Sequence, residues 1–240
     1  MTVLFNDAAQ KNYGTPTSGD DTVCPVPAGV VDGDLMVLVF LAGRDGGGQI
    51  NPTNPSGWTP FGGSLPHAVF DSLNFYVTTS LFWRVAASEP ADYTVTTPTL
   101  GGSSIPRSNA LIFAVSGAAA AAPTFSLAWH THGDPNSNYD ATATSITAAA
   151  GSLTAFVAHN WDLYGTQSPP SGMNERVRNG SSLIYLADEQ TGAGATGDRT
   201  QIGVNAFVNE AWTALLLNFA PATFGAAINP MSGLRGQPLA

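Results

Sequence analysis

Hydrophobic and polar residues alternate along this chain in short stretches, without the spacing of an amphipathic helix. The alternation is clearest in Leu81-Phe82-Trp83-Arg84-Val85, where Leu81, Trp83 and Val85 fall on one face of an extended segment. A period of two residues is typical of strands with one buried face and one polar or partner-facing face. We therefore predict at least nine strands, over Leu35–Leu41, Leu73–Ala86, Tyr93–Thr97, Ala110–Ser116, Thr124–Trp129, Ser152–His159, Ser181–Ala187, Gly203–Val208 and Trp212–Phe219.

Turn-forming residues separate the predicted strands. Asp32-Gly33-Asp34, Asn54-Pro55-Ser56-Gly57 and Asn179-Gly180 are three such breaks. Glycine, asparagine and aspartate tolerate the backbone conformations of tight turns, and proline ends a strand ladder. Many short strands between such turns predict an all-β protein, and we expect a jelly-roll-like antiparallel β-sandwich.

One domain is expected over residues 1–219. No linker divides this range, and the sequence shows no convincing internal repeat. Residues 220–240 differ, because they are rich in glycine and proline, weakly apolar and without periodicity. We expect a flexible C-terminal arm there, which either orders on a neighbouring subunit or is a disordered tail.

The small number of charged residues limits the partners. Charged residues make up 10% of the 240 residues, the formal net charge is −9, and Lys11 is the only lysine. Nucleic acids and anionic membrane surfaces attract clusters of cationic side chains, so we expect neither as a partner. The longest apolar run, Leu35–Ala42, is far shorter than the roughly 20 residues of a membrane-spanning helix.

Cys24 is the only cysteine, which excludes an intrachain disulfide and a cysteine-based zinc site. We expect Cys24 to be a small buried residue in a protein that is made in a reducing cytosol. The first residues lack the basic and apolar regions of a secretory signal peptide, so no secretion signal is expected.

The pair His130 and His132 is the pattern that most resembles a metal site. Residues two apart on a strand point the same way, so both imidazoles could reach one ion. Asp134, or His159 together with Asp162, could complete the ligand set. The alternative is a polar loop end, and we expect no bound metal and no other cofactor.

Four acidic residues near predicted strands suggest a polysaccharide hydrolase as one hypothesis: Glu175, Asp188, Glu189 and Glu210. Glycoside hydrolysis requires two carboxylates at a defined separation. Against this hypothesis, the four Glu and thirteen Asp residues give many accidental pairs, and no compact acid/base signature is present. The chain also carries neither a GxSxG nucleophile elbow nor a P-loop. We expect these residues to be solvated loop acids, and a protein without catalytic residues.

Three aromatic residues are candidates for contact with a partner or a glycan. Trp161 and Tyr164 lie in a loop-like segment, and Trp129 ends a predicted strand. Exposed tryptophan and tyrosine rings can stack on sugars or anchor a protein partner. Partial burial under a loop is the alternative. We expect Trp83 and Trp212 in the core, because each lies within a strand pattern.

Five segments follow one another in a recognisable order. They are PAGVVDGDLMVLVF (27–40), PSGWT (55–59), LFWRVAASEPADYTVT (81–96), ALIFAVSG (110–117) and AWTALLLNF (211–219). This order resembles a family of β-sandwich proteins of tailed bacteriophages and prophages, described as virion structural, minor tail or head-decoration proteins. The resemblance covers roughly Val23 to Phe219 and implies no catalytic residues. It implies a class of protein and no fixed position on the particle.

From this resemblance we expect a non-enzymatic structural protein of a phage virion. We place it first on the outside of the head, as a decoration or cement protein that stabilises the particle, because the domain is acidic, poor in lysine and freestanding. Its partners would be the major capsid protein or tail proteins, and its copies would form a homo-oligomer, with a trimer as the first hypothesis. It would be made in the host bacterial cytoplasm and lie on the virion exterior. The alternative is a tail- or fibre-associated module that binds a host surface glycan.

Overall fold

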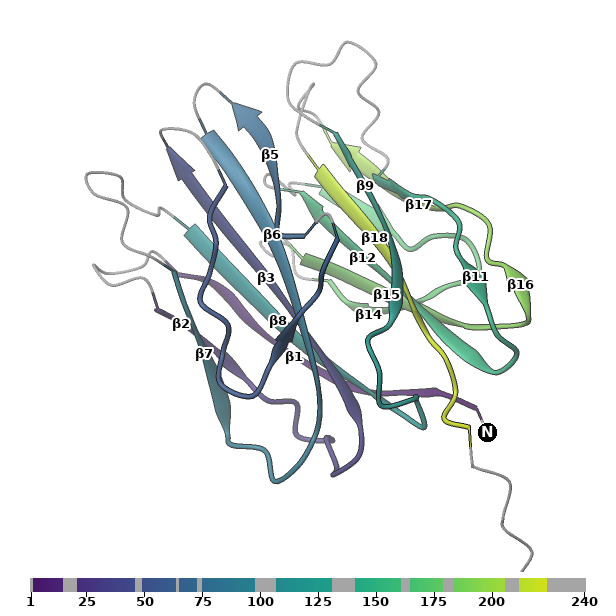
Figure 1. Cartoon of the computed structure of the whole chain (residues 1–240). Helices are drawn as coiled ribbons and strands as arrows, with labels where there is room; N and C mark the ends of the chain where they lie inside the picture. Colours follow the sequence, from purple (N-terminus) through teal and green to yellow (C-terminus); the bar gives the residue numbers. More distant parts are fainter. Residues whose placement is uncertain are drawn as a thin grey trace, which may run out of the picture.

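The computed structural model describes residues 2–14, 21–45, 49–63, 65–72, 75–97, 107–130, 141–160, 165–178, 184–205 and 212–223. All regular secondary structure in these residues is β-strand, which confirms the all-β prediction. Two antiparallel main sheets pack face to face as a β-sandwich (Figure 1). Within the described part of the chain, no helix is long and apolar enough to cross a membrane.

Each main sheet is built from one half of the chain. The first has the strand order β1-β8-β3-β6-β4, with β5 also paired to β6. Its strands are β1 (Leu4–Gly14), β3 (Leu35–Asp45), β4 (Thr59–Pro60), β5 (His67–Ser72), β6 (Phe75–Val85) and β8 (Arg107–Ser116). The second has the order β14-β15-β12-β18-β9. Its strands are β9 (Thr124–His130), β12 (Ser152–Asn160), β14 (Asn174–Val177), β15 (Ile184–Thr191) and β18 (Trp212–Phe219).

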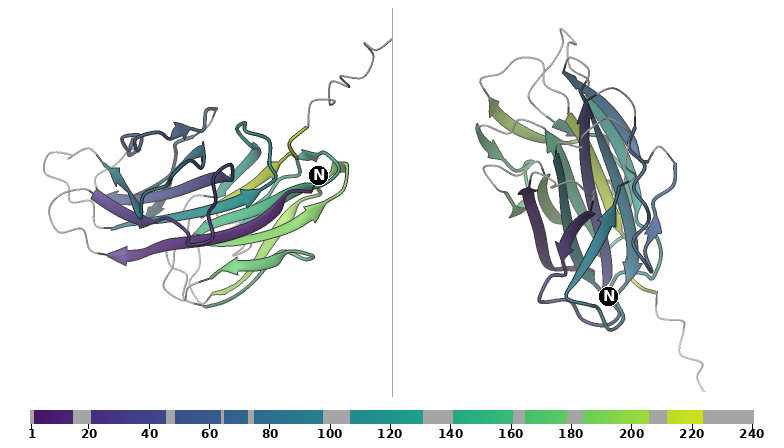
Figure 2. Two further views of the ribbon diagram at one scale, coloured as in Figure 1. Left: turned by 90° about the horizontal axis from the view of Figure 1, so that it is seen from below. Right: turned by 90° about the vertical axis from the view of Figure 1, so that its left-hand side faces the viewer.

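Smaller sheets cover the outer faces of the two main sheets (Figure 2). The first main sheet is covered by β2 (Asp21–Pro25) paired with β7 (Asp92–Thr96). The second is covered by β10 (Ala141–Ala143), β17 (Arg199–Asn205) and β13 (Gly165–Ser168), in that order. A short pair, β11 (Thr147–Ala148) with β16 (Gly194–Ala195), adds to this side.

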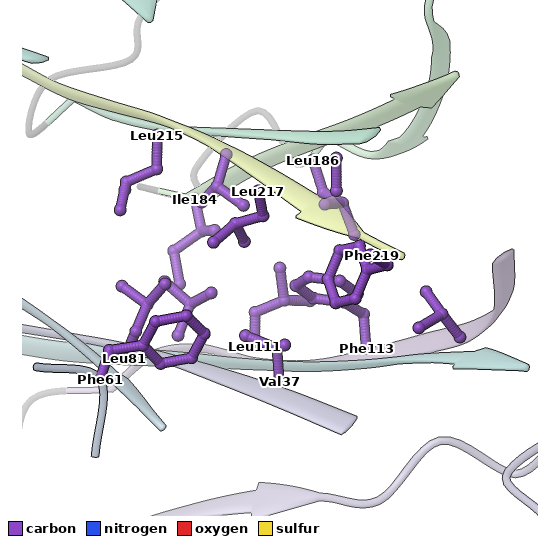
Figure 3. Close-up of a cluster of buried hydrophobic side chains, with 14 of the residues drawn as sticks. Val37, Phe61, Leu81, Leu111, Phe113, Ile184, Leu186, Leu215, Leu217 and Phe219 are labelled. Carbon is purple, nitrogen blue, oxygen red and sulfur yellow. The ribbon is translucent and has the colours of Figure 1, made fainter. Parts of the chain in front are cut away.

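The largest buried cluster, here the inner cluster, lies between the two main sheets. Figure 3 shows side chains that meet there: Val37, Leu81, Leu111 and Phe113 from the first sheet with Phe61 directly after β4, and Ile184, Leu186, Leu215, Leu217 and Phe219 from the second sheet. A first outer cluster lies under β2 and β7, and a second outer cluster lies under β10. Because both faces of each main sheet are covered, its central strands are apolar on both faces.

The alternation in β6 is confirmed on one face and wrong on the other. Leu81, Trp83 and Val85 pack on the inner cluster, as the pattern predicts. The opposite face is not free for solvent or a partner, because Phe82 is 2% exposed and belongs to the first outer cluster. In β7 the expectation holds: Tyr93 is buried, and Thr94 on the opposite face is exposed.

The two halves of the chain repeat one scheme of strand pairing. In the first half β1 pairs with β8, β2 with β7, and β3 with both β6 and β8. In the second half β9 pairs with β18, β10 with β17, and β12 with both β15 and β18. The repeat lies in the strand pairing, which the sequence pattern did not predict. Only the alternation of buried positions is shared by the two halves, and side-chain identity is not.

The two halves correspond residue by residue when the central strands are counted from the first residue that pairs with both neighbours, which is Leu35 in β3 and Leu153 in β12. Leu41 of β3 pairs with Asn109 and Thr79, and His159 of β12 pairs in the same way with Thr213 and Ile184. Within each half the strand pairs are nested, with β3–β6 inside β2–β7 inside β1–β8 and the equivalent order in the second half. A jelly roll that runs through the whole chain is not confirmed, because each main sheet comes from one half.

All nine predicted strands overlap strands of the structure, with corrected boundaries. β15 begins at Ile184 and runs to Thr191, and β17 begins at Arg199, ahead of the predicted start. The sequence pattern missed β1 because this strand lies at the sheet edge and is rich in polar residues. After β18 the chain pairs with residues 117–119: Ala119 N donates to Ala220 O, and Ala222 N donates to Gly117 O. The rest of the expected arm, residues 224–240, lies outside the described residues.

Candidate functional site

A row of polar side chains follows the inner cluster along the strands. At the level of the inward-facing Leu41, the pairing of the strands places five polar residues that also face inward. We call them the polar tier: His67, Thr79, Asn109, His159 and Thr213. All except His67 are at most 1% exposed. No sequence pattern indicates this group, because its members come from five strands and meet only when the sandwich forms.

Three members of the polar tier join the two sheets. His159 Nδ1 lies 3.2 Å from Thr213 Oγ1 and 3.5 Å from Thr79 Oγ1 of the opposite sheet. The two threonine hydroxyls lie 3.0 Å apart. Burial lowers the pKa of His159 to about 3, so its imidazole is neutral at neutral pH. A neutral, fully enclosed imidazole holds the sheets together and is sealed from any substrate in solution.

Trp129 lies where the polar tier meets the surface. Its side chain is 51% exposed, and its ring centre lies 4.4 Å from that of His67 on the opposite sheet. Trp129 belongs to β9, which ends the strand order of the second main sheet. An exposed ring on an edge strand that packs on a neighbouring side chain can contact a partner without a change of its own conformation. The other two aromatic candidates, Trp161 and Tyr164, lie outside the described residues.

The histidines of the predicted metal pattern do not share one face. His130 stacks on Trp212 with ring centres 5.9 Å apart, on the outer side of the second main sheet. His159 points to the inner side, so the hypothesis that it completes a ligand set with His130 is wrong. In the described ranges no group of three or more His, Cys, Asp or Glu side chains could hold a metal. His132, Asp134 and Asp162 lie outside those ranges, so the pair itself stays a prediction.

Three of the four acidic candidates form ion pairs with arginines. Arg176 binds Asp188 through two hydrogen bonds of 2.8 and 3.2 Å, and Arg199 Nε lies 2.7 Å from Glu189. The expectation of solvated loop acids is wrong here, since these acids lie on β14 and β15, and Asp188 is 1% exposed. The last member, Glu210, lies outside the described residues.

The acidic residues also point in different directions. Asp188 and Glu189 are neighbours on β15, so their side chains lie on opposite faces of the sheet. Asp188 faces β1, where its partner Arg176 lies 4.6 Å over the Phe5 ring, and Glu189 faces β17. Two carboxylates on opposite faces cannot flank one glycosidic bond. Glu175 accepts a hydrogen bond from Tyr185, and burial raises the pKa of that phenol.

The other core residues lie as predicted. Cys24 is fully buried in the first outer cluster. Trp83 packs on the inner cluster and Trp212 on the second outer cluster, both partly buried.

Among the described candidates, Trp129 is thus the one that reaches solvent from a rigid support. The ionisable side chains near it, His67 and His159, are held within the sandwich. A scan against protein-family models, a search of curated proteins and a search of solved structures each find no match to this chain.

Proposed function

We propose that this chain is a non-enzymatic structural protein of a tailed-phage virion, and specifically a decoration or cement protein on the outside of the head. The observation that carries the proposal is the exposed Trp129 on the edge strand β9, which offers a preformed contact for another virion protein. The order of sequence segments between Val23 and Phe219, which resembles that of phage structural proteins, supports the same role.

The use of charge in the fold agrees with a scaffold. The arginines at positions 176 and 199 bind acids of a neighbouring strand, and Arg84 binds Glu89 and Tyr93 within the first half. Charged groups that are paired in this way fix strand positions and add little to an open reaction site. Both outer faces of the main sheets are covered as well, so edges and ends are the surfaces through which such a protein would bind its neighbours.

A decoration protein stabilises a capsid by binding the assembled lattice and not the free subunits. In this proposal the major capsid protein is the partner, Trp129 is the anchor of the contact, and copies of the chain associate around a symmetry axis, with a trimer as the working model. Residues 224–240 would add a second contact with a neighbouring copy.

Cryo-electron microscopy of the intact particle tests the position. Density for this sandwich repeated over the capsid lattice, with β9 facing the capsid protein, is the expected result. Density confined to the tail would overturn the decoration role. The arm is tested separately by deletion of residues 224–240, which spares the pairing of Ala220 and Ala222 with residues 117–119. Unchanged binding to particles would remove the arm from the proposal.

A second function is favoured by the same exposed ring: recognition of a host surface glycan by a tail- or fibre-associated module. Tryptophan rings stack on sugars, and Trp129 presents about half of its surface. A glycan array with the full chain and with Trp129→Ala tests this function. A hit that the variant loses would favour recognition over decoration, and an array without hits would remove it.

A further inference from the structure

A pocket opens at the edge of the first main sheet, beside β4 and β5. Its volume is about 280 Å³, and it is lined by residues of three chain segments that meet at β6. Three prolines and apolar side chains that include Phe61 and Leu65 form the walls. Among the described residues that line the pocket, the polar groups are the amides of Asn51 and Asn54 and the hydroxyl of Ser80, and none of these residues is charged.

Ser80 is the polar group that this pocket leaves unsatisfied. The residue is 3% exposed, and its Oγ has no hydrogen-bond partner. A buried hydroxyl without a partner is unfavourable, because it has lost its hydrogen bonds to water. The Oγ is enclosed in the present side-chain rotamer, so a bound group would remove this deficit after the Ser80 side chain rotates towards the pocket. Asn51 and Asn54 are exposed at the rim, where they can meet the same group as it enters.

The second half of the chain shows what fits at the equivalent place. Ser80 of β6 pairs with Phe40 of β3, and by the repeated register Tyr185 of β15 pairs with Ala158 of β12. Tyr185 is 1% exposed and packs in the second outer cluster. Its hydroxyl donates a 3.1 Å hydrogen bond to Glu175 of β14. β14 is the counterpart of β5, because each is the outer neighbour of the equivalent strand.

The first half has Ser80 where the second half has Tyr185, and this difference leaves space on one side of Ser80 only. Phe40 fills the first outer cluster over β3 and does not line the pocket. The open volume lies on the other side of Ser80, towards β4 and β5, which corresponds to the direction in which Tyr185 reaches β14. The first half thus lacks a phenol ring that the second half supplies from its own strand.

We propose that this pocket is a binding site for a neutral aromatic group with a hydrogen-bonding substituent, of which the phenol ring is the model. Apolar walls receive the ring, and the Ser80 hydroxyl together with an amide at the rim binds the substituent. The absence of charge from the lining selects a neutral group over an ionised one. The ring has two possible sources: a tyrosine side chain of a protein partner, or a free small phenol. The site does not depend on the proposed virion role.

The test uses p-cresol, which is the side chain of tyrosine, with backbone amide NMR of the full chain. The expected result is saturable shifts at Ser80, Phe61 and Leu65, with a Kd on the order of 1 mM. Toluene, which has the same size without the hydroxyl, is expected to bind about five- to tenfold more weakly. Absence of shifts at these residues up to the solubility limit of p-cresol would overturn the proposal. Glucose that shifts them when p-cresol does not would also overturn it.

Two variants secure the assignment. Ser80→Leu fills the floor and removes the hydroxyl, and it is expected to weaken p-cresol binding at least about tenfold. Because Ser80 is buried, Asn54→Trp at the exposed rim is the second variant; it blocks entry without changing the core. If p-cresol binds equally well to both variants, the site is wrong. N-acetyltyrosinamide distinguishes the sources: affinity equal to that of p-cresol assigns a partner side chain, and loss of binding assigns a free phenol.

Discussion

Thr79 and Thr213 belong to opposite sheets, and their hydroxyl oxygens lie 3.0 Å apart in a fully buried position. His159 Nδ1 lies within reach of both hydroxyls. The three side chains therefore form a buried polar link between the two halves of the chain, beside the apolar contacts of the inner cluster.

Removal of one threonine hydroxyl is expected to lower the unfolding free energy by more than half of the decrease that removal of both hydroxyls causes. Thr79→Val keeps the shape and leaves Thr213 and His159 with one partner fewer, so we expect about 1–3 kcal/mol less unfolding free energy. The double variant Thr79→Val/Thr213→Val should lose less than the sum of the single variants. Urea unfolding measures all three, with the exposed Thr94→Val as the control, expected within about 0.5 kcal/mol of the parent. Strict additivity would show that the hydroxyls do not interact.

Stability is expected to fall as the pH drops from 7 to 5. The pKa of His159 is about 3 in the folded chain and about 6.5 when unfolded, so the unfolded state binds more protons between these values. The unfolding free energy should drop by about 2 kcal/mol over this interval from His159 alone. Burial also lowers the pKa of His67, which acts in the same direction.

The variant His159→Gln isolates this contribution. It keeps a polar side chain of similar size, and its unfolding free energy should depend less steeply on pH than that of the parent. Urea unfolding at several pH values between 7 and 5 gives both slopes. Parallel pH profiles for the variant and the parent would assign the dependence to other groups.

Two neighbouring arginines are expected to differ strongly in their effect on stability. Arg176→Gln leaves the 1% exposed carboxylate of Asp188 unpaired, and we expect the unfolding free energy to fall by about 2–4 kcal/mol. The decrease is smaller than for a fully buried pair because Arg176 itself is 37% exposed. Arg178→Gln is the matched control, since its pair with Glu175 is 43% and 32% exposed, and such a pair is worth about 0–1 kcal/mol. Equal decreases in the unfolding free energy of the two variants, measured by thermal or urea unfolding, would contradict the burial of Asp188.

Substitution of Trp129 is expected to weaken binding, whereas substitution of Trp58 is expected to lower stability. Trp129→Ala should change the unfolding free energy by less than about 1 kcal/mol and weaken binding to particles at least about tenfold. Trp58→Ala removes a ring that is 5% exposed and packs edge-on against Tyr93 at 5.2 Å, which should cost about 3–5 kcal/mol. Particle co-sedimentation and urea unfolding give the two readings. Wild-type binding by Trp129→Ala would remove this ring from the proposed contact.

The central strands could be predicted from the sequence because they are the strands with two buried faces. In Leu35–Leu41 every residue belongs to a cluster, so the run is apolar whichever face is considered. Edge strands carry no such signal: β1 reads LFNDAAQKNYG and has an unpaired side in the described sheet. Short strands such as β4 are set by their pairing with β6, which sequence alone does not contain.

The polar tier could not be predicted, because its members become neighbours only when the sheets pack. Thr79 and Thr213 are separated by 134 residues in the chain. The ion pairs of Asp188 and Glu189 could not be predicted for a similar reason: the arginines that bind these two acids lie on other strands. Trp129 could be found, since an aromatic residue at the end of an apolar strand is a local feature of the sequence.

The repeated pairing scheme has a consequence for how the sandwich comes apart. Among the described residues, the inner face of each half packs against the inner face of the other, as in a symmetric dimer, but here both halves belong to one chain. In a true dimer, dilution would separate the subunits; here the connection between Ser116 and Thr124 keeps the second half at a high effective concentration. Dilution should thus not separate the two halves, and a cut in that connection would make their association depend on concentration.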